Sequence, residues 1–102
     1  MLVHNSCKVD AVIEETLNGK GNITSKYSLT PDEALDAGQK FLGKGYTEIG
    51  KPGSGVFRSG DRIFRIDMNS LKGLHSPNVS HFHLEILDSA GLRIVNNHIP
   101  II

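Results

Sequence analysis

The sequence predicts an α+β domain with N-terminal helices packed on one face of a C-terminal antiparallel sheet. Apolar residues recur at helical spacing as far as Gly43, and beyond it apolar and polar residues alternate as they do in strands. The chain has 102 residues, 38% hydrophobic and 22% charged, which is typical of a single globular domain. Its one cysteine, Cys7, excludes an internal disulfide, so packing alone must hold the fold.

Two helices are expected before the sheet. The first spans residues 9–17, where apolar side chains follow helical spacing until an Asn-Gly pair ends it. The second begins with Thr30-Pro31-Asp32-Glu33, which has the pattern of a capping box, and it ends at Gly43. The polar segment between them, residues 20–28, is expected to be a loop or a short strand.

Five strands are expected after the second helix, separated by turns. Ser59-Gly60-Asp61 and Asp88-Ser89-Ala90-Gly91 have the composition of tight turns, and Gly91 is free to take a positive φ. The expected strands cover residues 46–49, 55–58, 62–66, 81–87 and 92–95.

The formal net charge is zero, with 11 basic and 11 acidic side chains, but these charges are unevenly distributed. Residues 40–75 contain seven basic and three acidic residues, whereas residues 1–39 contain three basic and six acidic ones. Such a local excess suits an anion-attracting patch, and it equally suits solvated charges spread over several faces. No apolar run approaches the roughly 20 residues that a membrane-spanning helix needs, so no membrane association is expected.

The strongest candidate site is the expected strand over residues 81–87. Alternation puts its apolar residues on the core face and places His81, His83 and Glu85 in a row on the other face. Two imidazoles and a carboxylate suit general acid–base catalysis, with Glu85 orienting one ring. The same trio suits a metal ion with open coordination positions, or a polar strand face exposed to solvent.

Further candidates flank this row. His75 precedes the strand in a loop and His98 follows the last expected strand, so four of the five histidines fall within the last 28 residues. Arginines suit phosphate because the guanidinium donates two parallel hydrogen bonds and stays charged. Arg65 lies deepest in its strand and is the preferred phosphate or transition-state ligand. The candidate substrate-binding residues are Arg58, Arg62, Lys72 and His98.

The opening segment Leu2-Val3-His4-Asn5-Ser6-Cys7 resembles the closing motif of intein-like Hint domains, in which a His-Asn pair precedes Ser or Cys. In bacterial polymorphic toxins such a Hint segment often precedes the C-terminal toxin. The resemblance implies that residues 1–7 are a tail from this junction and that residues 8–102 are a toxin domain. It also implies secretion or cell-surface delivery as part of a larger effector of the Rhs or contact-dependent inhibition type.

A second resemblance, over residues 30–101, is to C-terminal domains of hemagglutinin-like and Rhs-like toxins. Such domains are commonly nucleases, and many have a barnase/EndoU-like fold of helices packed on an antiparallel sheet. The segments that carry it are Gly45-Tyr46-Thr47-Glu48-Ile49, Gly55-Val56-Phe57-Arg58-Ser59, Phe64-Arg65-Ile66, residues 71–75, His81-Phe82-His83-Leu84-Glu85 and Asn97-His98-Ile99-Pro100-Ile101.

This resemblance implies RNA cleavage with no metal and no cofactor, in which the 2′-hydroxyl attacks phosphorus to leave a 2′,3′-cyclic phosphate. His83 and either His81 or His75 share the base and acid roles, beside Glu85, and Arg65 stabilises the phosphorane. The implied partners are RNA, with transfer RNA as one class by analogy, and a cognate immunity protein. The implied place of action is the cytoplasm of a target cell.

A competing resemblance is to zinc endopeptidases that cut peptidoglycan cross-links, whose signature closes on a motif similar to His81-Phe82-His83-Leu84-Glu85-Ile86. That signature also needs an earlier histidine with an aspartate a few residues later, and no such aspartate follows His75. The alternative function is therefore a zinc-dependent hydrolase, peptidase or nuclease, that uses His81, His83 and Glu85. A non-enzymatic binding module is the third hypothesis.

Overall fold

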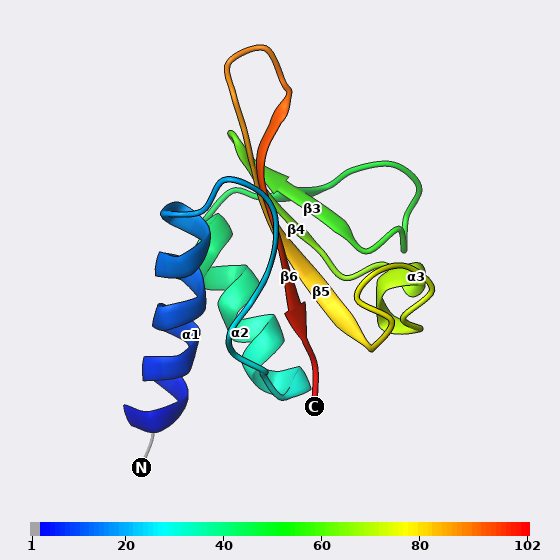
Figure 1. Ribbon diagram of the computed structural model, residues 1–102. Helices are drawn as coiled ribbons and strands as arrows, with labels where there is room; N and C mark the ends of the chain where they lie inside the picture. The colour runs from blue at the N-terminus through cyan, green and yellow to red at the C-terminus, as the bar shows by residue number, and fades with distance from the viewer. Residues whose placement is uncertain (1–2) are drawn as a thin grey trace.

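The computed structural model describes residues 3–102, with side chains from Cys7 onward. Over this range it has three helices and one six-stranded sheet in the order β1-β6-β5-β4-β3-β2. The helices α1 (Val3–Leu17) and α2 (Pro31–Leu42) lie side by side on one face of the sheet, and the short α3 (Met68–Leu71) lies beyond the other (Figure 1). The predicted α+β class, with N-terminal helices on one sheet face, is confirmed.

The sheet is antiparallel from β2 to β6, as predicted, and gains one parallel strand at its edge. That strand, β1, comes from the polar segment between the helices and pairs with β6, so segments from opposite ends of the chain lie side by side. The strands are β1 (Gly21–Thr24), β2 (Thr47–Glu48), β3 (Val56–Ser59), β4 (Arg62–Arg65), β5 (His81–Leu87) and β6 (Arg93–Pro100).

The first helix begins earlier than the sequence predicts. The apolar period starts at residue 9, whereas α1 begins at Val3, so residues 3–7 of the predicted tail are helical. Residues 4–6 and 8 are polar, so no apolar period joins Val3 to the pattern that begins at residue 9, which is why the pattern missed this turn. Residues 1–2 of the predicted tail lie outside the described residues.

The second helix has the predicted capping. The Thr30 side chain accepts a hydrogen bond from the Glu33 backbone N–H at 3.2 Å, and the Glu33 carboxylate accepts one from the Thr30 N–H at 2.9 Å. At the other end Gly43 has a φ of 74°, which a residue with a side chain rarely adopts. Of the helices in the described part of the chain, none is both long and apolar enough to cross a membrane.

The core lies between the two long helices and the sheet. Phe82 and Leu84 reach it from β5, and Phe64 reaches it from β4. At Gly38 the backbone of α2 approaches the Phe64 ring so closely that no side chain fits between them. The core cluster is Val9, Val12, Leu29, Ala34, Ala37, Phe41, Leu42, Phe64, Phe82, Leu84 and Ile99.

We predict that Gly38→Ala destabilises the fold. Alanine normally favours a helix over glycine, but here its Cβ would collide with three carbons of the Phe64 ring. Overpacking of this kind costs about 1–3 kcal/mol of unfolding free energy. Urea unfolding followed by circular dichroism measures it. Gln39→Ala, at the exposed neighbouring position of the same helix, is the control and should change stability by less than about 0.5 kcal/mol. Equal stability of the two variants would contradict the close approach.

Candidate functional site

Strand β5 carries three predicted site residues on the sheet face opposite the helices. Because Phe82 and Leu84 pack into the helix-side core, the alternating residues His81, His83 and Glu85 point the other way. These three side chains are only 0%, 1% and 2% exposed, respectively. The interpretation of the row as a solvent-exposed strand face is therefore wrong.

Helix α3 and the loop that follows it cover this polar face. Asp67 caps α3 by accepting a hydrogen bond from the Ser70 backbone N–H at 3.0 Å, and the buried Ser70 places its Oγ 3.0 Å from Nε2 of His83. Burial by itself raises the pKa of Asp67, but the hydrogen bonds from Ser70 and the charge of Arg65 outweigh it and lower that pKa. Asp67 is thus a charged cap that holds the cover in position.

The loop brings His75 over the strand, as its place in the sequence suggested. Nε2 of His75 lies 2.9 Å from Nε2 of His81 and 3.2 Å from Nε2 of His83. A hydrogen bond between two ring nitrogens needs a proton on one and a lone pair on the other. Whether Nε2 of His75 donates or accepts therefore depends on which nitrogens of His81 and His83 carry protons.

The outer nitrogens of the buried rings fix their tautomers. Nδ1 of His81 is 2.7 Å from the Val79 carbonyl oxygen, which only accepts, so Nδ1 carries the proton. Nδ1 of His83 lies 2.9 Å from Oδ1 of Asn96 and 3.2 Å from Nη2 of Arg65. Oδ1 of Asn96 only accepts and is the nearer of the two, so Nδ1 of His83 carries a proton and donates to it. Both rings then present an Nε2 lone pair to His75.

Burial lowers the pKa of both inner histidines. It lowers the pKa of His83 to about 3, against the Asn96 hydrogen bond and with the help of the Arg65 charge. It also lowers the pKa of His81, against the hydrogen bond to the Val79 carbonyl and with the help of His75. At neutral pH both rings are uncharged. His75 therefore donates its Nε2 proton to the pair, and its own Nδ1 is left with a lone pair.

His98 completes the group from the neighbouring strand. The predicted last strand ends at residue 95, but β6 continues to Pro100, so Asn96 and His98 lie within it, opposite Glu85 and His83. Nδ1 of His98 is 2.9 Å from the Ile23 carbonyl oxygen and donates to it, so Nε2 is the ring nitrogen left for other partners. The rings of His98 and His83 have their centroids 4.4 Å apart. His98 also lines an open polar pocket of about 350 Å³ together with Asn22, Ile23, Thr24 and Ser76.

Glu85 is held between two arginines. Oε2 of Glu85 accepts from Nη2 and Nε of Arg65 at 2.8 and 3.0 Å, and Oε1 lies 3.2 Å from Nε of Arg93. Arg65 also lies 3.6 Å from the Asp67 carboxylate. Both carboxylate oxygens of Glu85 are thus engaged by guanidinium groups, so it is a structural counter-charge for the arginines rather than a free base or an open metal ligand.

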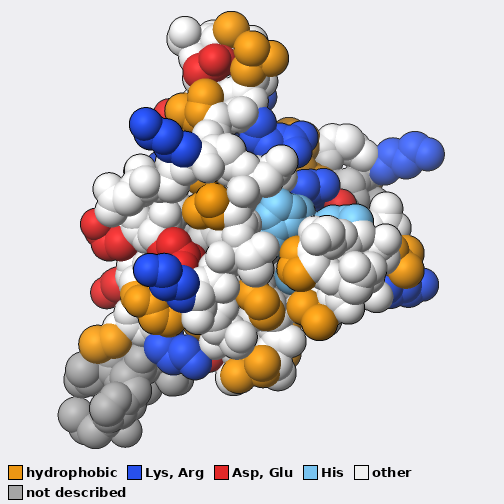
Figure 2. Space-filling model, viewed as in Figure 1, with side chains coloured by type: hydrophobic (Ala, Val, Ile, Leu, Met, Phe, Trp, Pro, Cys, Tyr) orange, Lys and Arg blue, Asp and Glu red, His pale blue; other side chains and the backbone are white. Residues whose placement is uncertain are grey.

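Six predicted site residues gather on this one face: His75, His81, His83, His98, Arg65 and Glu85. Histidine side chains reach the surface here, next to Lys and Arg side chains (Figure 2). Comparisons of the chain with protein-family models, curated proteins and solved structures give no match.

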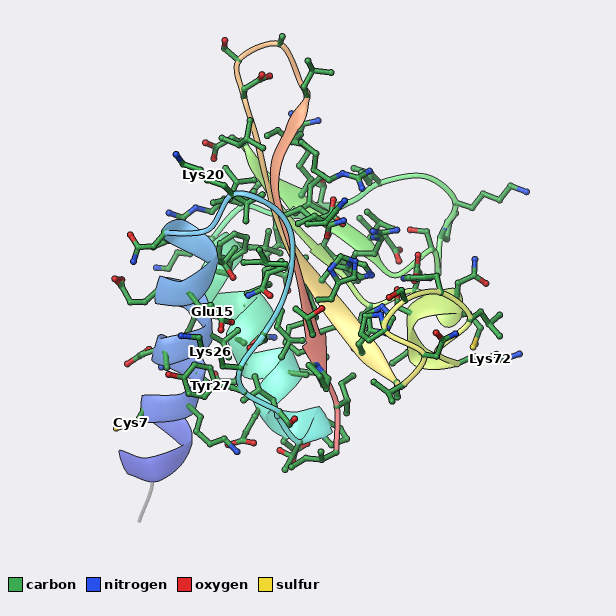
Figure 3. The ribbon with its side chains drawn as sticks, viewed as in Figure 1. Cys7, Glu15, Lys20, Lys26, Tyr27 and Lys72 are labelled. Carbon is green, nitrogen blue, oxygen red and sulfur yellow. The ribbon has the colours of Figure 1, made fainter. Side chains whose placement is uncertain are left out.

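Three predicted substrate-binding residues lie apart from the imidazoles. Arg62 is on the helix face of the sheet, where it donates to the Phe41 carbonyl at 2.9 Å and covers the Phe41 ring. Arg58 is exposed and donates to the Gly60 carbonyl in its own turn at 2.8 Å. Lys72 points outward beyond the end of α3 (Figure 3). Of the four candidates, His98 alone lies among the clustered rings.

The sequence patterns missed four residues that shape the site. Asn96 stands two residues before His98, a spacing that would have placed both on one strand face had the strand been extended beyond residue 95. Asp67 precedes Ser70 by three residues, which is an N-cap signal in front of a helix too short to show periodicity. Arg93 has no local signal, because its partner Glu85 is on another strand.

We predict that Glu85→Gln destabilises the domain by about 3 kcal/mol, since it leaves Arg65 without its main counter-charge beneath the cover. Arg93→Gln removes the other partner, but Arg93 is 51% exposed whereas Glu85 is 2% exposed. Its loss should cost less than about 1 kcal/mol. Thermal and urea unfolding measure the change in unfolding free energy for both variants. An equal loss of unfolding free energy in the two variants would show that the Glu85 carboxylate is not the centre of this ion-pair network.

Proposed function

We propose that this domain is an endoribonuclease that cleaves RNA by histidine acid–base chemistry and needs no metal ion. The observation that carries the proposal is the gathering of four imidazoles on one sheet face, of which the half-buried His75 and His98 are accessible to a substrate. Phosphodiester cleavage needs a base, an acid and positive charge near the phosphorane. The two accessible imidazoles supply the base and the acid, and the protonated acid also supplies the positive charge.

The tautomers support a division of roles. His75 donates through Nε2 to the two buried rings, so its Nδ1 is the lone pair available to take a proton. His98 is held through Nδ1 by the Ile23 carbonyl, so its Nε2 is the nitrogen that faces a substrate. We assign the base to His75 and the acid, in its protonated form, to His98.

The proposed reaction is an internal transfer within the RNA chain. Nδ1 of His75 removes the proton of a ribose 2′-hydroxyl while the 2′-oxygen forms a bond to the adjacent phosphorus. The bond from phosphorus to the 5′-oxygen breaks, and protonated His98 gives its Nε2 proton to that oxygen. The products are a 2′,3′-cyclic phosphate end and a 5′-hydroxyl end. Arg65, whose Nη2 lies 3.2 Å from Nδ1 of the buried His83, is already paired with Glu85 and Asp67, so we assign the positive charge beside the reacting phosphate to protonated His98.

His81 and His83 act as positioning residues in this proposal. They are 0% and 1% exposed, so RNA does not reach them in this conformation. Their Nε2 atoms accept the His75 proton and so fix which nitrogen of His75 is the base. This is the role that an orienting group plays behind a catalytic histidine. The resemblance assigned the base and acid roles to His83 and either His81 or His75; this proposal keeps His75 and replaces the β5 histidines with His98.

The biological setting is part of the same proposal. The resemblance to polymorphic toxins implies that the domain is delivered as the end of a larger effector and cleaves RNA in the cytoplasm of a target cell. A cognate immunity protein would then bind the domain in the producing cell. Transfer RNA is the substrate class favoured by analogy, and the open pocket beside His98, with its amide and hydroxyl side chains, suits ribose and phosphate groups.

We predict that the purified domain cleaves total RNA in the presence of excess chelator. Because the proposed chemistry uses only side chains, chelation should not lower the rate, and the new ends should be 2′,3′-cyclic phosphates. An oligonucleotide with a 2′-deoxy sugar at the cleaved position is the control and should stay intact, since it lacks the nucleophile. Cleavage that chelator abolishes and zinc restores would refute the proposal in favour of a zinc-dependent hydrolase.

We predict that His75→Ala and His98→Ala each lower the RNA cleavage rate by about 10²- to 10⁴-fold, the usual contribution of a general base or acid. The rate is measured on a labelled RNA at substrate saturation, after circular dichroism confirms the native spectrum. Leu74→Ala is the matched control, because Leu74 adjoins His75 in the loop yet is 64% exposed. Full activity of His75→Ala would exclude this ring as the base.

A further inference from the structure

The cluster of His75, His81 and His83 also has the spacing of a metal site. Each residue offers one ring nitrogen, and the three nitrogens lie within 4.8 Å of one another. From Nε2 of His75 the distances are 2.9 Å to His81 and 3.2 Å to His83. Zinc in tetrahedral coordination, with Zn–N bonds of about 2.05 Å, separates its ligand nitrogens by about 3.3 Å. The His81 and His83 nitrogens lie within 4.8 Å of each other, so these two rings would close on an ion placed between the three.

The surroundings of the cluster resemble the outer shell of a metal site. A metal-bound histidine usually donates its other ring N–H to a carbonyl or carboxylate, which fixes the ring and directs the free lone pair at the metal. Nδ1 of His81 has the Val79 carbonyl at 2.7 Å, and Nδ1 of His83 has the Asn96 side-chain oxygen at 2.9 Å. The two buried rings are therefore already in the tautomer that a metal requires.

The donor set selects the class of ion. Three neutral imidazoles suit zinc, copper and nickel, whereas calcium and magnesium prefer oxygen ligands. Glu85, the nearest buried carboxylate, has both oxygens engaged by Arg65 and Arg93 and does not join the set. Ser70 Oγ, 3.0 Å from Nε2 of His83, is a neutral oxygen at the edge of the cluster. The site thus offers three nitrogen ligands and leaves a fourth position for water.

The charged side chains around the three histidines do not oppose the binding of a cation. Arg65 is the nearest positive group, but it lies behind His83 on the Nδ1 side, away from the converging Nε2 atoms. Its charge is met by Glu85 at 2.8 Å and by Asp67 at 3.6 Å. A divalent ion at the Nε2 atoms therefore faces compensated charge rather than a bare guanidinium.

We propose that His75, His81 and His83 bind one divalent ion of the zinc class, and that this ion inhibits the domain. The inhibition rests on the proposed RNA cleavage, whereas the binding does not. The ion takes the position of the proton that His75 shares with the two buried rings. His75 then coordinates through Nε2, and its single proton moves from Nε2 to Nδ1. The lone pair that the proposed base needs is lost, so the metal-bound domain does not remove the 2′-hydroxyl proton.

Metal binding is tested without RNA by calorimetric titration of the whole domain with Zn²⁺. We expect one ion per chain, with the affinity lowered at least 10-fold by His75→Ala, which removes a ligand from the loop and leaves the sheet intact. His98→Ala is the matched control and should bind as the wild type does, because this ring is outside the set of three. A second measurement, titration of the wild type with Co²⁺, does not depend on any substituted protein. It should give the intense visible absorption of tetrahedral coordination.

Several results overturn this proposal. Zn²⁺ that fails to bind at millimolar concentration, or that binds His75→Ala as tightly as the wild type, refutes the three-histidine site. If the ion binds as expected, RNA cleavage is compared with zinc and with chelator, and we expect zinc to reduce the rate at least 10-fold. Unchanged or faster cleavage with bound zinc refutes the inhibition. If no RNA is cut under either condition, the proposed function fails, while calorimetry still decides the metal site.

Discussion

Strand β5 is buried on both faces, and most of the structure depends on how those two faces are satisfied. One face is apolar and needs only the two long helices to remove it from water. The other carries His81, His83 and Glu85, whose polar atoms lose water and must find partners inside the protein. These partners come from β4, β6, α3 and the loop beyond it, so four separate segments are held in place by one strand.

Burial also sets the number of protons that the cluster can hold. Two rings with lowered pKa values are neutral and donate outward, so their inner nitrogens are both lone pairs. His75 supplies the ring proton that lies between the three rings, and the Ser70 hydroxyl is a second donor to Nε2 of His83. In the two proposals, this arrangement is what makes Nδ1 of His75 the base and the three Nε2 atoms the cation site. The proposed catalytic role and the proposed metal site are thus two consequences of one hydrogen-bond pattern, and they exclude each other.

The sequence patterns predicted the elements whose signals are local. The capping box at Thr30, the alternation along β5 and the turn at Gly91 each depend on neighbouring residues, and the structure confirms all three. Strand β6 was predicted too short because Asn97 interrupts the apolar alternation. Asn97 is fully buried on the helix face, where its amide donates to Thr16 and Glu15 of α1. Only the packed helix makes a polar residue acceptable at that position.

The parts of the site that depend on distant partners were not predictable in the same way. The pattern placed Arg65 inside a strand and expected a phosphate as the partner of its charge. The actual neighbours are Glu85 and Asp67, one on another strand and one at the cap of α3. Likewise, a single turn such as α3 has no periodicity to detect, and the position of His75 depends on how this turn and the loop fold over β5. Alternation revealed which residues share a face, but not what covers it.

The charge balance of the finished site gives its last constraint. Arg65 and Arg93 are matched by Glu85 and Asp67, so two positive and two negative side chains leave the network formally neutral. In the proposed reaction, therefore, protonated His98 is the uncompensated cation nearest the phosphate. A zinc-class ion at the three histidines would add two positive charges on this face while removing the base. In these proposals, attraction of the phosphate chain depends on the net charge of this face, whereas cleavage of the chain depends on the lone pair of His75. The two properties are therefore separate.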